Sequence, residues 1–198
     1  LQAKLRELAE RLRAEGLFAP ERKTALPDWP TCLGLVTSPT GAAARDIIKI
    51  ARRRAPGLRL VLSPCQVQGQ TAPLEIVAAL ERLERWGGCD VIIVGRGGGS
   101  AEDLQAFNDE RVVRAIASAR TPLVSAVGHE IDLTLADLAA DARAATPSEA
   151  AVLVAPDVRT QRAGLLGLRK ALDQALLDRL REARRRLEEL ARSRALTR

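Results

Sequence analysis

The chain has no methionine and no tyrosine, and among its 198 residues it has only two tryptophans, two phenylalanines and one histidine. With so few aromatic side chains, stacking on aromatic rings is not the main device if single-stranded nucleic acid binds here, and backbone electrostatics would have to dominate. Because the sequence starts at Leu1 and contains no methionine, we expect it to be a fragment of a longer protein.

Cysteines and long apolar runs are also scarce. Cys32, Cys65 and Cys89 are far apart and form no C-x-x-C pair, which favours reduced, buried thiols in a cytoplasmic protein. No apolar run approaches the roughly 20 residues that a membrane helix needs, and no signal peptide is visible, so we expect no membrane partner. The net charge of +6 favours a polyanionic partner.

Three regions follow from the patterning. Residues 1–30 predict an N-terminal helix, with leucines at helical spacing, and a linker that contains three prolines. Residues 31–156 predict an α/β domain. Residues 157–198 predict the start of a long amphipathic helix of the coiled-coil type, because leucines recur every three or four positions among many charges.

Within the α/β domain, apolar runs alternate with helical patterns. We expect strands over 32–37, 59–63, 90–94 and 122–127, and helices over 41–55, 73–86, 100–119 and 131–140. Continuous apolar strands are typical of a parallel sheet that is buried on both faces. The predicted fold is α/β: an open, mostly parallel four-stranded sheet flanked by helices, Rossmann-like or flavodoxin-like. In such sheets ligands bind beyond the carboxyl ends of the strands, here after the first, third and fourth strands.

Three helix starts carry capping signals. Thr40 is expected to cap the first of these helices, and Ser100 with Asp103 to form a capping box for another. Thr146, followed by a proline and by Glu149, predicts a further helix beginning at the proline.

A glycine-rich loop follows the third strand. Gly97, Gly98, Gly99 and Ser100 can turn tightly, so that successive backbone N–H groups form a cradle for an anion. Arg96 adds a planar, permanently charged group that suits phosphate. A second phosphate seat is expected after the first strand, from Ser38, Thr40, Gly41 and the helix N-terminus that follows.

The loop does not fit the common nucleotide-binding patterns. A Walker loop needs a lysine before its final Ser or Thr, and a dinucleotide fingerprint needs a third glycine where Ser100 stands. It also needs an acid about 20 residues on, where residues 117–120 contain none. Carboxylates are present, but none shows the paired spacing of a two-metal nuclease, so no metal ligands are predicted.

His129, the single histidine, comes directly after the fourth strand. Histidine titrates near neutral pH and suits general acid–base chemistry. Asp132, three residues on, either orients the imidazole or caps a helix, and the spacing alone leaves both open. Asp46, near the start of a helix, is by itself as consistent with a partner for the helix dipole as with catalysis. An Arg–His–Asp set can carry phosphoryl transfer without a metal.

Several long motifs in the right order closely resemble the large subunit of bacterial exodeoxyribonuclease VII. They are residues 36–43 with Asp46, 95–104, 107–110, 125–132, 140–144 and 146–148. The resemblance implies a single-strand-specific DNA exonuclease that acts from both ends, releases short oligonucleotides and has no strict need for a divalent metal, which would be stimulatory at most. It implies Asp46, Arg96, His129 and Asp132 as the catalytic residues.

The resemblance also implies partners and missing parts. Several copies of a small helical subunit would pack on the long helical region, and a homodimer through that helix is the alternative. An N-terminal OB-fold and the C-terminal portion would lie outside this sequence. A phosphate- or nucleotide-binding module without catalysis, and a metal-dependent nuclease, remain the competing interpretations.

Overall fold

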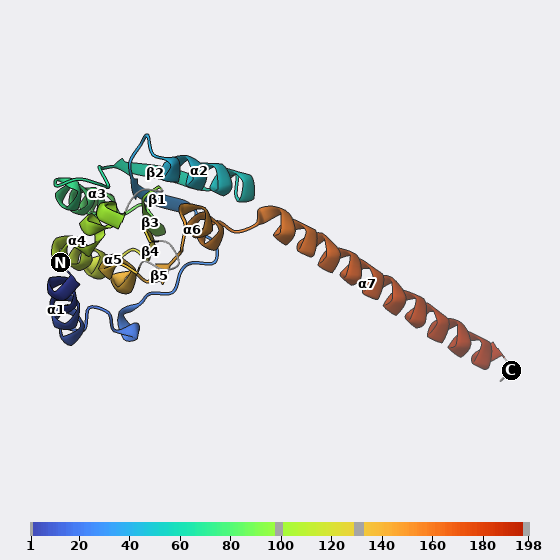
Figure 1. Ribbon diagram of the computed structural model, residues 1–198. Coiled ribbons are helices and arrows are strands. Elements are labelled where there is room, and N and C mark those ends of the chain that lie inside the picture. Colours follow the sequence, from blue (N-terminus) through green and yellow to red (C-terminus); the bar gives the residue numbers. More distant parts are fainter. Residues whose placement is uncertain (1, 98–100, 129–132, 196–198) are drawn as a thin grey trace. The chain divides into compact units, whose positions relative to one another are not determined.

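The computed structural model describes residues 2–97, 101–128 and 133–195. The chain divides into two units, Leu1–Pro156 and Asp157–Arg198, and each is described by itself. The first unit is an α/β domain, and the second is a single helix (Figure 1).

The centre of the first unit is a five-stranded parallel sheet with the order β2-β1-β3-β4-β5. The strands are β1 (Cys32–Thr37), β2 (Arg59–Pro64), β3 (Val91–Gly95), β4 (Leu123–Ala126) and β5 (Ala142–Arg143). The predicted open parallel sheet is therefore confirmed. The expected count of four strands misses β5, because a two-residue strand is too short to leave a hydrophobic pattern.

Helices cover both faces of the sheet (Figure 1). One apolar cluster joins the sheet to α3 (Ala72–Trp86), α4 (Glu110–Ser118) and α5 (Leu135–Ala139). The other joins it to α2 (Ala42–Arg54) and α6 (Pro147–Val154). All five residues of β3 are buried, as a strand covered on both faces requires.

Some helix boundaries differ from the sequence-based expectation. The helix expected over 100–119 is in fact a 3₁₀ helix, Ala101–Asn108, followed by α4, whose N-cap Asp109 accepts a hydrogen bond from the Arg111 backbone N–H. α2 has Gly41 at its N-cap and no side-chain cap, so the assignment of this role to Thr40 is wrong. The expected Thr146 cap of α6 is confirmed, since its side chain accepts from the backbone N–H of Glu149.

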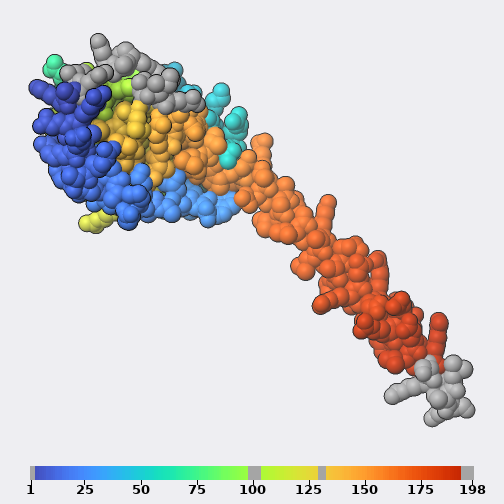
Figure 2. Space-filling model, turned by 60° about the horizontal axis from the view of Figure 1, so that its bottom comes forward, coloured from blue at the N-terminus to red at the C-terminus, as the bar shows by residue number. Residues whose placement is uncertain are grey.

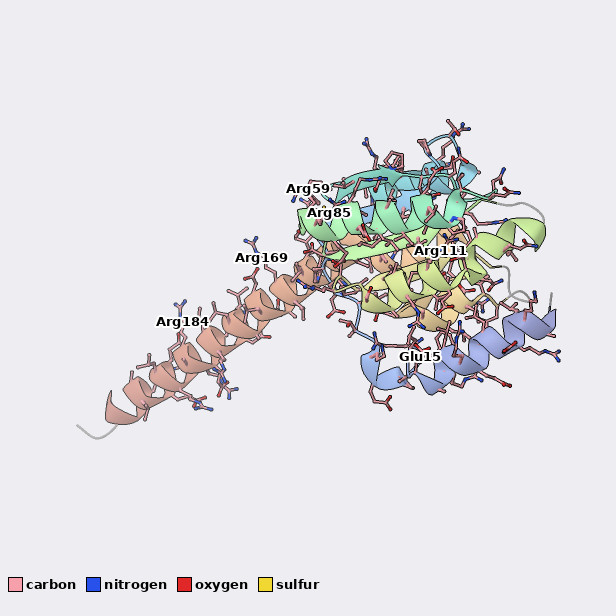
Figure 3. The ribbon with its side chains drawn as sticks, turned by 90° about the vertical axis from the view of Figure 1, so that its left-hand side faces the viewer. Glu15, Arg59, Arg85, Arg111, Arg169 and Arg184 are labelled. Atoms are coloured by element: carbon pink, nitrogen blue, oxygen red, sulfur yellow. The ribbon has the colours of Figure 1, made fainter. Side chains whose placement is uncertain are left out.

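The N-terminal residues pack on this unit. α1 (Gln2–Ala14) buries Leu12 against Val113 of α4 and Leu135 of α5. Glu15, just after α1 and labelled in Figure 3, holds Arg114 of α4 through Nη1–Oε2 and Nη2–Oε1 distances of 2.7 and 3.0 Å. This pairing raises the pKa of Arg114 and lowers that of Glu15.

The segment after α1 runs along the outside of the sheet on the β5 side (blue in Figure 2). Phe18 packs with the α1 cluster, and Leu26 packs against the cluster on the α2 and α6 face. Between them, the Thr24 backbone N–H donates to Asp141 Oδ1 at 2.7 Å, next to β5. The segment thus passes beside the edge strand β5 and is held there by this hydrogen bond.

The second unit is α7 (Val158–Ala195), a helix of 38 residues, which confirms the expected long C-terminal helix. Its leucines are largely exposed, from 48% for Leu177 to 70% for Leu168. Charged side chains one turn apart form ion pairs along α7, as Arg186 Nε and Glu182 Oε1 do at 2.9 Å. Arg169 and Arg184 of this helix are labelled in Figure 3. Within the described ranges, no helix is apolar and long enough to cross a membrane.

Candidate active site at the carboxyl edge of the sheet

The candidate site lies where the strand order reverses. From β1 the chain passes to β2 on one side and then to β3 on the other, and open α/β sheets bind their ligands at such a reversal of strand order. Parallel pairing places Val36 of β1 opposite Val94 of β3, and Gly95 opposite Ala126 of β4. The residues that follow these strands therefore meet at one edge of the sheet.

Arg96 is the first residue after β3, and its side chain is turned into this edge. It is only 6% exposed, its backbone N–H donates to Ala126 O at 3.3 Å, and its Nε donates to Gly97 O at 3.1 Å. Charged side chains are rarely buried this fully unless they have partners. Its position after β3 is the one that the sequence predicts.

Asp46 and Arg96 line one pocket of about 420 Å³, which we call the Asp46 pocket. Asp46 comes from the second turn of α2, and Arg96 from the end of β3. The remaining walls come from Ala42, Ala43, Gly97, Ala126, Val127, Ala145, Thr146, Pro147 and Ser148. The first turns of α2 and α6 both contribute to this lining, and the N-terminus of a helix favours negative charge.

Arg96 and Gly97 also line a second pocket of about 340 Å³, which we call the Thr37 pocket. Its other walls are Thr37, Ser38, Gly41, Ala42, Gln66, Val67 and Gln68. Gly97 lies against the start of α2, where an added Cβ would be 3.5 Å from Ala42 Cβ and from Ala43 N. The two pockets are therefore neighbours with a shared wall formed by Ala42, Arg96 and Gly97.

The predicted second phosphate seat is in the loop between β1 and α2. Ser38 and Gly41 line the Thr37 pocket, and the Thr40 hydroxyl lies 3.4 Å from that of Ser38. Arg45 Nη2 donates to the carbonyl of Thr40 at 3.1 Å, which holds this loop to α2.

The rest of the predicted site falls outside the described residues. His129, Asp132, Gly98, Gly99 and Ser100 are in this group. Of the four predicted catalytic residues, the structure thus places Asp46 and Arg96, and it brings these two together. In the described part of the chain, no three His, Cys, Asp or Glu side chains gather as a potential metal-ligand set.

Sequence reasoning missed several residues of this edge. Gln66 and Gln68 follow β2, a strand end that was not considered, and neither carries a charge that would draw attention. The start of α6 was recognised as a helix start but not as a wall of the site. The signal that could have found Gln66 and Gln68 is the parallel sheet itself, because all its strands end at this edge.

A buried carboxylate ties the end of β4 to the start of α5. Asp137 is 3% exposed, and it accepts hydrogen bonds from Ser125 Oγ at 2.6 Å and from Thr134 N and Oγ1 at 2.9 and 2.8 Å. Arg143 Nε of β5 lies 3.8 Å from its Oδ2. These contacts fix both ends of the segment 127–133 that contains His129 in sequence.

Comparison with known proteins identifies the family of this chain. The model of the family "Exonuclease VII, large subunit" matches residues 17–198. The chain belongs to this family. The resemblance drawn from the sequence motifs is thereby confirmed.

Curated relatives in the family are similar over most of this chain. It is 54% identical over 194 residues to the exodeoxyribonuclease 7 large subunit of Moorella thermoacetica, covering 98% of this chain and 48% of that protein. The corresponding protein of Desulforudis audaxviator is 55% identical over 190 residues, with 96% and 47% covered. That of Pseudomonas aeruginosa is 51% identical over 185 residues, with 93% and 40% covered. The chain spans about half the length, or less, of these relatives.

Proposed function

We propose that this chain carries the catalytic core of an exonuclease of the exodeoxyribonuclease VII type. It hydrolyses phosphodiester bonds of single-stranded DNA from both ends, gives short oligonucleotides and does not strictly require a divalent metal. The observation that carries the proposal is the pocket that Asp46 and Arg96 both line, at the strand-order reversal and beside two helix N-termini. Membership of the family and the net charge of +6 support it.

In this proposal Arg96 holds the scissile phosphate. Its guanidinium, the backbone N–H groups of Gly97, Gly98 and Gly99, and Ser100 stabilise the charge that develops on the phosphate oxygens. A buried, fixed arginine is suited to this work because it does not reorganise as the reaction proceeds. Ser38, Thr40 and Gly41 provide further contacts to the DNA backbone.

The chemical step is the attack of water on phosphorus, with loss of the bridging oxygen on the opposite side. One proton leaves the water, and one proton must reach the departing oxygen. We assign His129 as general acid or base, Asp132 as the group that orients it, and Asp46 as the group that positions water or handles the other proton. His129 is two residues beyond Val127, which lines the Asp46 pocket, so the chain leads from this wall to the histidine.

The partners proposed are single-stranded DNA and several copies of the small subunit. The exposed leucines of α7 support a helical partner, because a stripe of this kind packs against another helix. A homodimer through α7 is the competing arrangement, and the mass of the assembled complex distinguishes the two.

The test is cleavage of end-labelled single-stranded DNA by the complete protein with its partner subunits, with a chelator present. His129→Ala should abolish cleavage and leave folding intact. Arg96→Lys keeps the charge but loses the planar, multidentate contact, and should slow cleavage about 100- to 1000-fold. Arg53→Lys, at an exposed position near the end of α2, is the matched control.

Each competing function predicts a different result. Binding of the oligonucleotide without cleavage by the unaltered protein would indicate a non-catalytic phosphate-binding module. Cleavage that stops when chelator is added would indicate a metal-dependent nuclease. Near-normal cleavage by the His129→Ala variant would refute the assignment of this residue.

A further inference from the structure

The Thr37 pocket shares Arg96 and Gly97 with the Asp46 pocket, and its remaining walls have features that suit an anion of its own. We propose that it binds a second phosphate of the DNA strand, the one next to the phosphate that is cleaved. That the anion is a DNA phosphate rests on the proposed function, whereas anion binding by the pocket does not. Four features of the described residues carry the proposal.

The first feature is a buried hydroxyl that has no partner. Thr37 ends β1, is 1% exposed and lines the pocket. Among the described residues, its Oγ1 is the one buried side-chain polar atom without a hydrogen bond. Such atoms are rare in folded proteins because an unmade hydrogen bond lowers stability. A phosphate oxygen in the pocket would give this hydroxyl its acceptor.

The second feature is the start of α2. Gly41 is the N-cap and has no side chain to cap the helix, and the first backbone N–H groups of a helix have no partner within the helix, so they suit an outside acceptor. Gly41 and Ala42 both line the pocket. The aligned peptide dipoles of this 13-residue helix also favour a negative charge at its start.

The third feature is the charge of the walls. Among the described residues that line the pocket, Arg96 carries a charge and none is a carboxylate. Ser38, Gln66 and Gln68 add neutral groups that can donate hydrogen bonds. The Asp46 pocket differs in having a carboxylate beside the same arginine. One pocket is therefore suited to holding a phosphate, and the other to reacting with one.

The fourth feature is that the wall after β2 is braced. The Gln66 backbone N–H donates to Glu75 Oε2 at 2.8 Å, and the Thr71 hydroxyl lies 3.4 Å from Gln66 Oε1 and 3.2 Å from Glu75 Oε1. With its oxygen in contact with Thr71, the Gln66 amide keeps its NH₂ group as a donor. Cys65 and Val67 are buried in the apolar cluster on the α3 face and anchor this segment, whereas Gln66 and Gln68 are exposed.

The shared wall places the two ligands next to each other. Because Arg96, Gly97 and Ala42 line both pockets, an anion in the Thr37 pocket is adjacent to one in the Asp46 pocket. Consecutive phosphates of one strand satisfy this arrangement. The Thr37 pocket would then bind the strand equally in the ground state and the transition state, and would affect affinity more than the chemical step.

The first variant is Thr37→Val, which removes the hydroxyl and keeps the shape. In the complete protein it should bind a single-stranded oligonucleotide about tenfold more weakly, the loss of one hydrogen bond to a charged group. The thermal stability of Thr37→Val should be unchanged or higher, because among the described residues the Thr37 hydroxyl makes no hydrogen bond that the substitution would remove. Thr121→Val, before β4 at the opposite edge of the sheet, is the matched control.

The second variant is Gln68→Glu, which puts a negative charge on the pocket wall. It should weaken binding of the oligonucleotide more than Gln70→Glu does, although both place the same charge on exposed positions of one loop. Equal effects of the two substitutions would contradict a phosphate held at Gln68.

The decisive experiment replaces single phosphates of the oligonucleotide by neutral methylphosphonates, and measures both binding and cleavage. A methylphosphonate next to the cleaved linkage should weaken binding to the unaltered protein, and should weaken binding to Thr37→Val by a smaller factor, because the hydroxyl's share of the contact is already lost. A penalty that is the same in both proteins overturns the proposal. If the unaltered protein binds with this penalty but cleaves no linkage, the second phosphate site stands and the proposed nuclease function fails.

Discussion

Removal of the Asp137 carboxylate by Asp137→Ala should be among the most destabilising single changes in the α/β unit. The side chain is 3% exposed, and its two oxygens accept three hydrogen bonds at 2.6 to 2.9 Å. Their donors, the Ser125 hydroxyl and the Thr134 hydroxyl and backbone N–H, are also buried. Because these donors are buried, water cannot readily accept their hydrogen bonds once the carboxylate is removed.

The magnitude follows from these contacts. A hydrogen bond to a charged group contributes about 1.5–3 kcal/mol, and three such bonds to one side chain do not add fully. We therefore expect Asp137→Ala to lower the free energy of unfolding by about 3–5 kcal/mol, comparable to removing one partner of a buried ion pair. Total stabilities are about 5–15 kcal/mol, so the variant should be close to unfolding at moderate temperature.

The assay is urea unfolding, followed by circular dichroism. Asp28→Ala, at an exposed carboxylate, should change the free energy of unfolding by less than about 0.5 kcal/mol. The double variant Asp137→Ala/Ser125→Ala should lose less free energy of unfolding than the sum of the two single variants. In the double variant no buried Ser125 hydroxyl is left without an acceptor. A loss below about 1 kcal/mol in Asp137→Ala would refute the reasoning.

Three further predictions concern other parts of the molecule. Gly34→Ala should lower the free energy of unfolding by about 1–3 kcal/mol, since the new Cβ would be 2.9 Å from Cys89 Sγ; an unchanged urea midpoint would contradict this. Hydrogen bonds from Thr31 lower the pKa of Asp90. The stabilisation of the folded state that these bonds give is complete above the ordinary pKa of Asp, and it is lost as the pH falls through the lowered pKa of Asp90. Asp90→Asn should therefore flatten the acid limb of the stability–pH curve, and an unchanged limb would count against it. Gly164→Ala, where the added methyl meets open space, should stabilise α7 by about 1 kcal/mol and raise its helicity by circular dichroism; no gain would contradict it.

The elements with strong patterns were predictable from the sequence. The continuous apolar runs gave the long strands, and the leucine spacing gave α7. The order of the strands was not predictable, because it depends on which helix crosses which face. β5 has two residues and leaves no pattern. The single helix expected over 100–119 is instead a 3₁₀ helix followed by α4, and Asp109 caps the start of α4.

The site was predictable where its residues carry charge. Arg96 follows a buried strand and a glycine loop follows it, and Asp46 belongs to a motif that resembles the family, so both were expected. The Thr37 pocket was only partly expected. Its walls include neutral residues such as Thr37 and Gln68, which look ordinary in sequence and gain meaning only from burial, missing partners and shared walls.

The central claim is that Asp46 and Arg96 act on one phosphate. The most direct test is the single-turnover rate of cleavage of single-stranded DNA by Asp46→Asn, Arg96→Lys and the double variant, each in the complete protein at saturating enzyme. If the two residues act together in one transition state, the double variant should be about as slow as the slower single variant. A double variant whose loss is the product of the two single losses would contradict the claim.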